Sequence, residues 1–186
     1  CQVKRGETIA CLSDLSTRLE YVQAAFSVAR IMGADIYEMR TSAVPSWTRV
    51  GVETVGACKG TVEALKAADL LLCFHVPLFT RWLKQVRDAG TRVLMIVDHP
   101  DDLAAHMSTP AVKKATIYGS QRLRVAKTMR ITNESGTEFS ANITEFDSFH
   151  QYGFADESGH FDHWGAGHLY TFPNEGSAQG IVVIQP

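Results

Sequence analysis

Through the first hundred residues, short apolar runs alternate with stretches whose apolar residues recur at helical spacing. The apolar runs predict strands, at Thr8 to Leu12, Ala34 to Met39, Leu70 to Val76 and Arg92 to Val97. The stretches between them predict helices, at Leu19 to Met32, Ala57 to Ala68 and Thr80 to Ala89. Thr17 and Glu20 have the spacing of a capping box ahead of the first helix. Such alternation indicates a mostly parallel sheet with flanking helices.

The pattern of predicted elements changes after the fourth predicted strand. Pro110 to about Arg124 is expected to form a helix, and two alternating runs around a Glu-Ser-Gly turn predict a β-hairpin, at Lys127 to Asn133 and Thr137 to Ile143. A loop rich in glycine and histidine follows at 152–167, and further strands are predicted at His168 to Phe172 and Gly180 to Ile184. The expected fold is therefore α/β, with a hairpin and a Gly/His-rich loop after the parallel sheet.

The chain has the size and composition of one globular domain. It holds 186 residues, of which 45% are hydrophobic and 20% charged, so we expect residues 1–186 to form a single α/β domain. It begins with Cys1 rather than Met, which we interpret as a sign that it is part of a longer polypeptide. An alternative is that Cys1 is an N-terminal nucleophile exposed by self-cleavage.

The placement of charges and cysteines limits the kinds of partner and the cellular compartment that we expect. Residues 1–130 hold all 18 Lys and Arg and have a net charge of +6, whereas 131–186 hold 8 acidic residues and no Lys or Arg. The basic run at 111–130 has little aromatic interleaving, so we expect a solvated helix face rather than a nucleic-acid site. Neither a membrane span nor a signal peptide is visible. Cys11 and Cys73 lie in apolar runs and have no close partner in sequence, which favours buried thiols and a cytoplasmic protein.

Ligands of open parallel sheets bind beyond the carboxyl ends of the strands. His75 and His99 occupy such ends, and no glycine-rich phosphate loop follows any predicted strand. In the Gly/His-rich loop, Asp162 stands beside His163, and a carboxylate next to an imidazole suits proton transfer. A simpler interpretation is a surface loop that Trp164 pins to the core.

A metal site in the same loop is a further alternative. His160, His163 and His168, with Asp156, Glu157 or Asp162, could supply nitrogen and oxygen ligands. The spacing fits no familiar metal signature, and HExxH is absent.

The run YGFADESGHFDHWGAGHLYTFPNEGSAQG closely resembles the N-terminal half of the 2,5-dihydroxypyridine 5,6-dioxygenases of nicotinic-acid degradation. Those enzymes are non-haem Fe(II) ring-cleaving dioxygenases, and their fold is related to the metallo-aminopeptidases called aminopeptidase T. The resemblance is densest in YG-x-AD-E-x-G, DHW and PNE-x-SA-x-G, and it continues loosely upstream through AADL and GTR.

The resemblance implies a division of labour between two halves of one enzyme. The family's iron ligands come from the C-terminal half, so this chain is expected to carry no primary metal ligand and to depend on that half for Fe(II). It should contribute to the pocket of a small aromatic or N-heterocyclic substrate. The resemblance assigns His163 as a substrate-facing catalytic imidazole, with Asp162 and Trp164 as its supports, and it implies a homo-oligomer.

Two departures from the family pattern affect the substrate. Alignment between AADL and GTR places Phe79 where the family has a histidine proposed as acid/base, and His75 lies four residues earlier. Gln151 replaces a family glutamate before the Tyr-Gly pair, which removes a charge. These pocket positions, all expected to contact substrate, predict a relative that acts on a different ring.

Three functions therefore remain open. The first is the substrate-side half of an Fe(II) extradiol-type dioxygenase that cleaves a hydroxylated pyridine or a related ring. The second is a metallo-aminopeptidase or amidohydrolase on the same scaffold, in which metal-activated water attacks a carbonyl. The third is an α/β interaction module that binds a partner through its acidic end.

Overall fold

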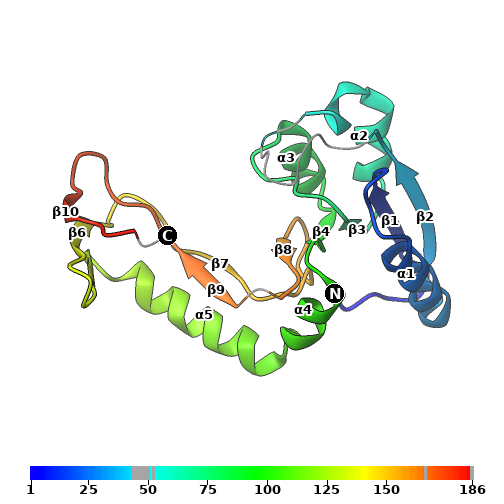
Figure 1. Cartoon of the computed structure of the whole chain (residues 1–186). Coiled ribbons are helices and arrows are strands. Elements are labelled where there is room, and N and C mark those ends of the chain that lie inside the picture. Colours follow the sequence, from blue (N-terminus) through cyan, green and yellow to red (C-terminus); the bar gives the residue numbers. More distant parts are fainter. Residues whose placement is uncertain (43–50, 52, 166, 185–186) are drawn as a thin grey trace. The chain divides into compact units, whose positions relative to one another are not determined.

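The computed structural model describes residues 1–42, 51, 53–165 and 167–184, and their contacts divide the chain into two compact units (Figure 1). Unit 1 comprises Cys1–Ser108 and Gly153–Ala166, and unit 2 comprises Thr109–Tyr152 and Gly167–Pro186. No helix among the described residues is long and apolar enough to cross a membrane.

Unit 1 contains a five-stranded parallel sheet. Its strands are β1 (Thr8–Ser13), β2 (Asp35–Arg40), β3 (Leu70–Cys73), β4 (Arg92–Met95) and β8 (Phe161–His163), in the order β2-β1-β3-β4-β8. Each neighbouring pair is parallel. The α/β class and the parallel sheet predicted from the sequence are confirmed.

The fifth strand lies inside the segment that the sequence analysis treated as a loop. Residues 161–163 pair with β4 so that Leu94 lies opposite Asp162 and Met95 opposite His163. A three-residue strand is too short to show an alternating pattern, and its pairing partner is more than sixty residues away. This pairing places His163 at the carboxyl end of the sheet.

Helices cover the two faces of this sheet unequally. Helix α1 (Leu19–Met32) lies on one face and ends at Gly33, whose φ of 71° is left-handed. The short helix η1 (Val55–Ala57), α2 (Lys59–Lys66) and α3 (Arg81–Asp88) lie on the other, and α4 (Pro100–Ala105), which was not predicted, follows β4. The expected capping box is wrong, because Arg18 is the N-cap of α1 and Thr17 bonds to Asp14 instead.

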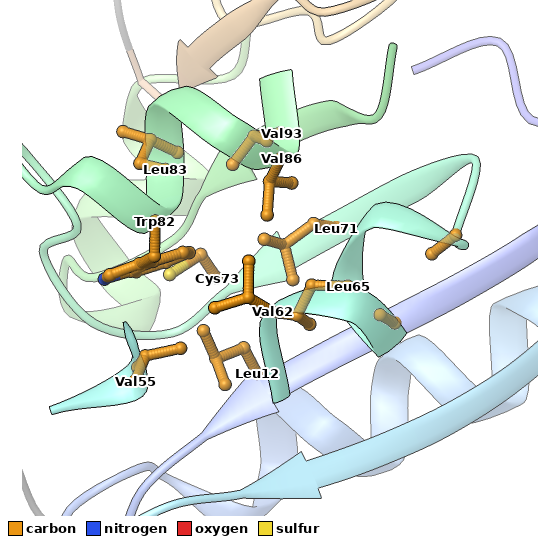
Figure 2. Close-up of a cluster of buried hydrophobic side chains, with 12 residues drawn as sticks. Leu12, Val55, Val62, Leu65, Leu71, Cys73, Trp82, Leu83, Val86 and Val93 are labelled. Carbon is orange, nitrogen blue, oxygen red and sulfur yellow. The ribbon is translucent and has the colours of Figure 1, made fainter. Parts of the chain in front are cut away.

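The main hydrophobic core lies between the sheet and the pair α2 and α3 (Figure 2). Leu12, Leu71 and Cys73 of the sheet are fully buried there against Leu65 and Trp82. Truncation of a buried aromatic side chain of this kind lowers the free energy of unfolding by roughly 3–5 kcal/mol, so this face of the sheet is tightly packed.

Unit 2 joins a helix to two small antiparallel sheets. Its elements are α5 (Pro110–Arg124), β5 (Thr128–Thr132), β6 (Glu138–Asn142), β7 (Phe149–Gln151), β9 (His168–Tyr170) and β10 (Gln179–Ile181). Strands β5 and β6 form the predicted hairpin, β10 extends it, and β7 pairs with β9. The Oγ1 of Thr109 accepts a hydrogen bond from the Val112 amide and caps α5.

Candidate functional site

Polar side chains that could take part in binding or catalysis lie at the carboxyl edge of the parallel sheet. The chain runs from β1 outward to β2 and from β3 outward to β4, so the topological switch point lies between β1 and β3. Ligands of open α/β sheets bind at such points. Asp14, His75, Asp98 and His163 follow or end β1, β3, β4 and β8 at this edge.

His163 lies within hydrogen-bonding distance of a carboxylate that follows the neighbouring strand. Its Nε2 lies 3.1 Å from Asp98 Oδ2, and the two side chains are 24% and 45% exposed. The Tyr21 hydroxyl donates to the Asp98 carbonyl oxygen over 2.6 Å, which fixes the backbone of this residue. A cavity of about 300 Å³ is lined by Asp98 together with Asp102, Leu103, His106 and Gly165. Asp98, the partner of His163, therefore borders a space that a small ring could enter.

Asp162 supports His163 through the backbone and holds a second histidine through its side chain. Its Oδ1 accepts hydrogen bonds from the amides of Gly153 and His163, and its Oδ2 lies 3.2 Å from His160 Nε2. Asp162 is completely buried. These bonds secure both ends of the segment 153–163, so Asp162 positions the strand that carries His163.

Trp164 anchors the chain directly after β8. Its backbone amide donates to the Met95 carbonyl, and its indole Nε1 donates to the Leu103 carbonyl over 3.0 Å. The ring packs against an apolar cluster that includes Leu94 and Ala155. The predicted supporting role therefore has a geometric basis, although the ring contacts the core rather than the His163–Asp98 pair.

His75 lies at the switch point and is almost completely buried. It lines a crevice of about 200 Å³ together with Asp14, Thr17, Tyr21 and Ile96. Its Nδ1 has no hydrogen-bond partner within the described part of the chain. Burial lowers the pKa of His75, and the negative charge of Asp14 opposes that shift in part. The imidazole is therefore neutral at pH 7 and has one unsatisfied nitrogen.

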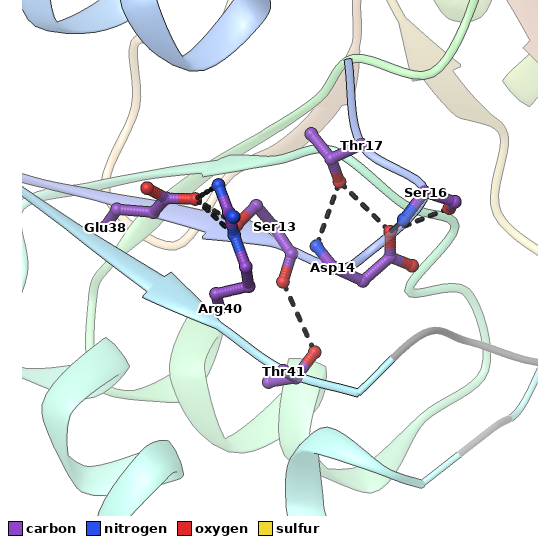
Figure 3. A network of polar contacts seen from close by, with 7 residues as sticks. All are labelled: Ser13, Asp14, Ser16, Thr17, Glu38, Arg40 and Thr41. Carbon is purple, nitrogen blue, oxygen red and sulfur yellow. Dashed lines mark hydrogen bonds and ion pairs between the residues drawn. The ribbon is translucent and has the colours of Figure 1, made fainter. Parts of the chain in front are cut away.

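Asp14 is fixed by the turn that leaves β1 (Figure 3). Its Oδ1 accepts bonds from the amide and hydroxyl of Ser16 and from the Thr17 hydroxyl. Beside it, Ser13 donates to Glu38 Oε1, which also pairs with Arg40, and these bonds lower the pKa of Glu38. This network holds the ends of β1 and β2 together, so Asp14 is a rigid wall of the crevice.

Phe79 projects from the loop between β3 and α3. Its side chain is 81% exposed, and its φ of 61° is unusual for a residue with a bulky side chain. Strained backbone of this kind persists where the surroundings hold it in place, and it is common at ligand sites.

Gln151 belongs to a different unit from the other predicted site residues. It belongs to β7 of unit 2, is buried, and pairs with His168 of β9. Of the predicted site residues, His75 and His163 lie at the carboxyl edge of the parallel sheet, whereas Gln151 belongs to a different sheet.

Sequence reasoning did not identify Asp98, which pairs with His163, or Tyr21, which bonds to the Asp98 backbone. Asp98 was visible only as the residue after an apolar run, and Tyr21 only as one position of an amphipathic helix. Parallel pairing of β4 with β8 brings Asp98 to His163. A strand end followed by Asp is a usable signal, but the partner could not be chosen without β8.

The described residues offer no ligand set for a metal ion. Among residues 1–42, 51, 53–165 and 167–184, no three His, Cys, Asp or Glu side chains gather in a metal-binding arrangement. Of the loop histidines, His160 pairs with Asp162 and His163 with Asp98, while His168 belongs to β9 of unit 2. The residues described here therefore do not fit an iron centre by themselves.

Comparison with known proteins supports the resemblance seen in the sequence. The family model of 2,5-dihydroxypyridine 5,6-dioxygenase (NicX) matches residues 1–186. The chain is 29% identical over 191 residues to the 2,5-dihydroxypyridine 5,6-dioxygenase of Pseudomonas putida KT2440, covering 98% of this chain and 55% of that protein. The chain belongs to the 2,5-dihydroxypyridine 5,6-dioxygenase family.

Solved structures agree with that family and with the wider fold. The structure of the Pseudomonas putida KT2440 dioxygenase superposes with a TM-score of 0.86 at 28% identity, over 94% of this chain and 52% of that one. Aminopeptidase AmpT of Thermus thermophilus superposes with a TM-score of 0.58 at 9% identity, over 96% of this chain and 59% of that one, and shares the fold alone. The chain thus spans about half the length of the dioxygenase that it matches.

Proposed function

We propose that this chain is the N-terminal, substrate-side half of a ring-cleaving dioxygenase. The substrate would be a hydroxylated pyridine or a related small aromatic ring. Membership of the dioxygenase family supports the reaction type, and coverage of about half of the relative supports a second half elsewhere in the polypeptide. The contact of His163 with Asp98, a residue that lines a cavity, is the observation on which the role of this half rests.

His163 is proposed to move the proton of a ring hydroxyl. When the imidazole takes that proton, Asp98 at 3.1 Å stabilises the resulting imidazolium. The buried Asp162 and the anchored Trp164 keep β8 in register with β4, so the imidazole stays beside Asp98, which lines the cavity. A positioned general acid or base of this kind contributes typically about 10²- to 10⁴-fold to the rate.

The other predicted contacts would set substrate choice. His75 can offer a neutral imidazole nitrogen to a polar ring substituent, and exposed Phe79 can offer an aromatic face. Gln151 would contribute an uncharged amide in place of a carboxylate. We propose that these three positions distinguish the ring used here from that of the Pseudomonas enzyme.

We also base our proposals for the cofactor, the oligomeric state and the cellular compartment on the family resemblance. Fe(II) would be bound by the remaining half of the polypeptide, since the residues described here form no ligand set, and no step above passes through it. We further propose a homo-oligomer in the cytoplasm. Light scattering tests the assembly, because the measured mass of the longer polypeptide should exceed that of one copy.

The test uses the longer polypeptide loaded with Fe(II) and supplied with 2,5-dihydroxypyridine and related rings. We expect oxygen uptake together with loss of the ring's ultraviolet absorption. His163→Ala should lower kcat at least about 100-fold while the iron content is unchanged. His99→Ala is the matched control, because His99 also follows β4 but is half exposed and pairs with Asp101.

Two results would contradict this proposal. Loss of iron in His163→Ala would mean that the imidazole is a metal ligand. Release of an amine or amino acid from a peptide or amide substrate, without oxygen uptake, would support the aminopeptidase or amidohydrolase alternative.

A further inference from the structure

One face of the central strands of the parallel sheet is covered less completely than the other. Strand β3 is the middle strand of the five, and on the face of α2 and α3 its residues Leu71 and Cys73 are fully buried. On the opposite face Leu70 and Leu94 are buried, but Leu72 of β3 and Ile96, which follows β4, are only partly buried. Parallel sheets are normally covered on both faces, so this asymmetry requires an explanation.

The less covered face forms an apolar groove of about 380 Å³. Its floor is made by β3 and β4 together with Ile9 of β1, and one wall is made by α1. The N-terminal residues 1–3, Leu103 and Trp164 form the rest of its lining. On α1 the residues that line it are Tyr21, Ala24, Ala25, Val28, Ala29 and Met32. No charged side chain lines it among the residues that the structure describes. An occupant must therefore present an apolar surface.

Spacing indicates that the groove has the dimensions of one helix. Strands lie about 4.8 Å apart and packed helices about 8–10 Å apart, so one helix covers about two strands. Helix α1 packs mainly on β1 and β2, and its Tyr21, Val22 and Ala25 reach Leu72, Phe74 and Ile96, so a second helix would complete the cover of β3 and β4. From Leu70 to Phe74 the floor extends about 13 Å, the length of roughly nine helical residues.

We propose that this groove holds the apolar face of an α-helix supplied by the part of the polypeptide outside the 186 residues. This inference rests on the two-half organisation in the proposed function, and the relatives are about twice as long as this chain. A second copy is a poor occupant, because a twofold interface places the same patch on both partners and two concave grooves cannot fill each other.

Two substitutions on α1 test the proposal. Val28 lines the groove and is 53% exposed, whereas Ile31 is 85% exposed and does not line it. Val28→Lys and Ile31→Lys replace β-branched residues on the same helix by the same side chain, so changes in helix propensity are matched. Neither residue belongs to the proposed catalytic edge.

In the longer polypeptide, Val28→Lys should lower the folding equilibrium constant of this domain at least about tenfold, because it buries a charge. Ile31→Lys should change it less than about threefold. In the 186-residue chain, where the groove is open, the two variants should differ by less than about threefold. Urea unfolding monitored by tryptophan fluorescence measures all four proteins. Binding of a hydrophobic dye should be stronger to the shorter chain than to the longer one.

Several outcomes would overturn the inference. One is equal tolerance of both substitutions in the longer polypeptide, and another is an equally large effect of Val28→Lys in the 186-residue chain. A dimer of the 186-residue chain that Val28→Lys dissociates would assign the groove to a second copy. A native polypeptide with no residues beyond these 186 would also overturn it. Failure of ring cleavage would contradict the proposed function but would leave these stability measurements unchanged, so the two proposals can be tested separately.

Discussion

His75 shows how burial sets the protonation state of a single residue. Its pKa lies below the ordinary value of 6.5 because desolvation penalises the imidazolium. As pH falls through 6.5, the unfolded chain binds a proton that the folded chain resists. Folding stability attributable to His75 is therefore present above pH 6.5 and decreases below it, until the pH reaches the lowered folded-state pKa.

We predict that His75→Gln reduces the loss of stability between pH 7 and pH 5. Gln does not titrate, so the proton uptake linked to unfolding disappears at this position. Urea unfolding at a series of pH values measures the slope. The unsubstituted protein, measured over the same series, is the control. An unchanged slope in His75→Gln would mean that the folded protein protonates His75 as readily as the unfolded chain does.

The cysteines differ in reactivity for an equally local reason. Burial raises the pKa of Cys11 and of Cys73 to about 12, whereas hydrogen bonds from Thr61 and Gly60 lower the pKa of exposed Cys58. We predict that a thiol reagent at pH 7.5 modifies Cys58 first, and Cys11 and Cys73 only after unfolding. Mass spectrometry of peptides taken at intervals gives the order. Rapid labelling of Cys11 in the folded protein would contradict the burial of β1.

At the scale of elements, the attachment of the 153–163 segment decides where His163 lies. Gly159 has a φ of 67°, its amide donates to the Gly90 carbonyl, and its own carbonyl accepts from Arg87 Nε. A Cβ on Gly159 would lie 2.6 Å from the Arg87 carbonyl oxygen. This position therefore needs glycine for both its backbone conformation and the close approach of α3.

We predict that Gly159→Ala destabilises the protein by about 2–4 kcal/mol, from the left-handed conformation and the steric clash together. Gly176→Ala is the matched control, because Gly176 has a similar φ of 71° but nothing within 4 Å of an added Cβ. It should cost only about 1–2 kcal/mol. Chemical unfolding gives both values, and equal costs would show that the contact with α3 relaxes easily.

Sequence periodicity identified the elements that are long or fully apolar. The strand at β3 was predicted because four consecutive apolar residues begin it, and α1 because its apolar residues recur through fourteen positions. The three-residue strands β9 and β10 overlap predicted strands, but β7 and β8, with three residues each, and α4, with six, were missed. Their positions depend on pairing and packing with distant segments, which periodicity does not encode.

The candidate site was predictable only in part for the same reason. His163 and Asp162 were found from the chemistry of adjacent residues and from the family motif. Asp98 was missed because its contact with His163 spans 65 positions in sequence. Thr17 was misassigned as a cap, since its hydroxyl has a nearer acceptor and donor in the turn at Asp14.

At the scale of the whole molecule, the two units differ in how much apolar surface they bury. Most buried hydrophobic residues belong to unit 1, whereas Ala141, Ile143 and Tyr152 are those of unit 2 within the described ranges. Almost all side chains of β5, β9 and β10 are exposed. Because buried apolar area dominates local stability, the units should open at different free energies.

We predict that amide hydrogen exchange in the 186-residue chain separates the two units. Amides of β1 and β3 should exchange only through global unfolding of unit 1, while those of the β5–β6 hairpin should exchange at least about tenfold faster through local opening. Exchange measured by mass spectrometry on peptides from Thr8–Ser13 and Glu138–Asn142 makes the comparison, because each range forms one strand. Equal protection of both peptides would mean that the units unfold as one cooperative body, since two bodies of such unequal cores cannot match in stability by their own contacts.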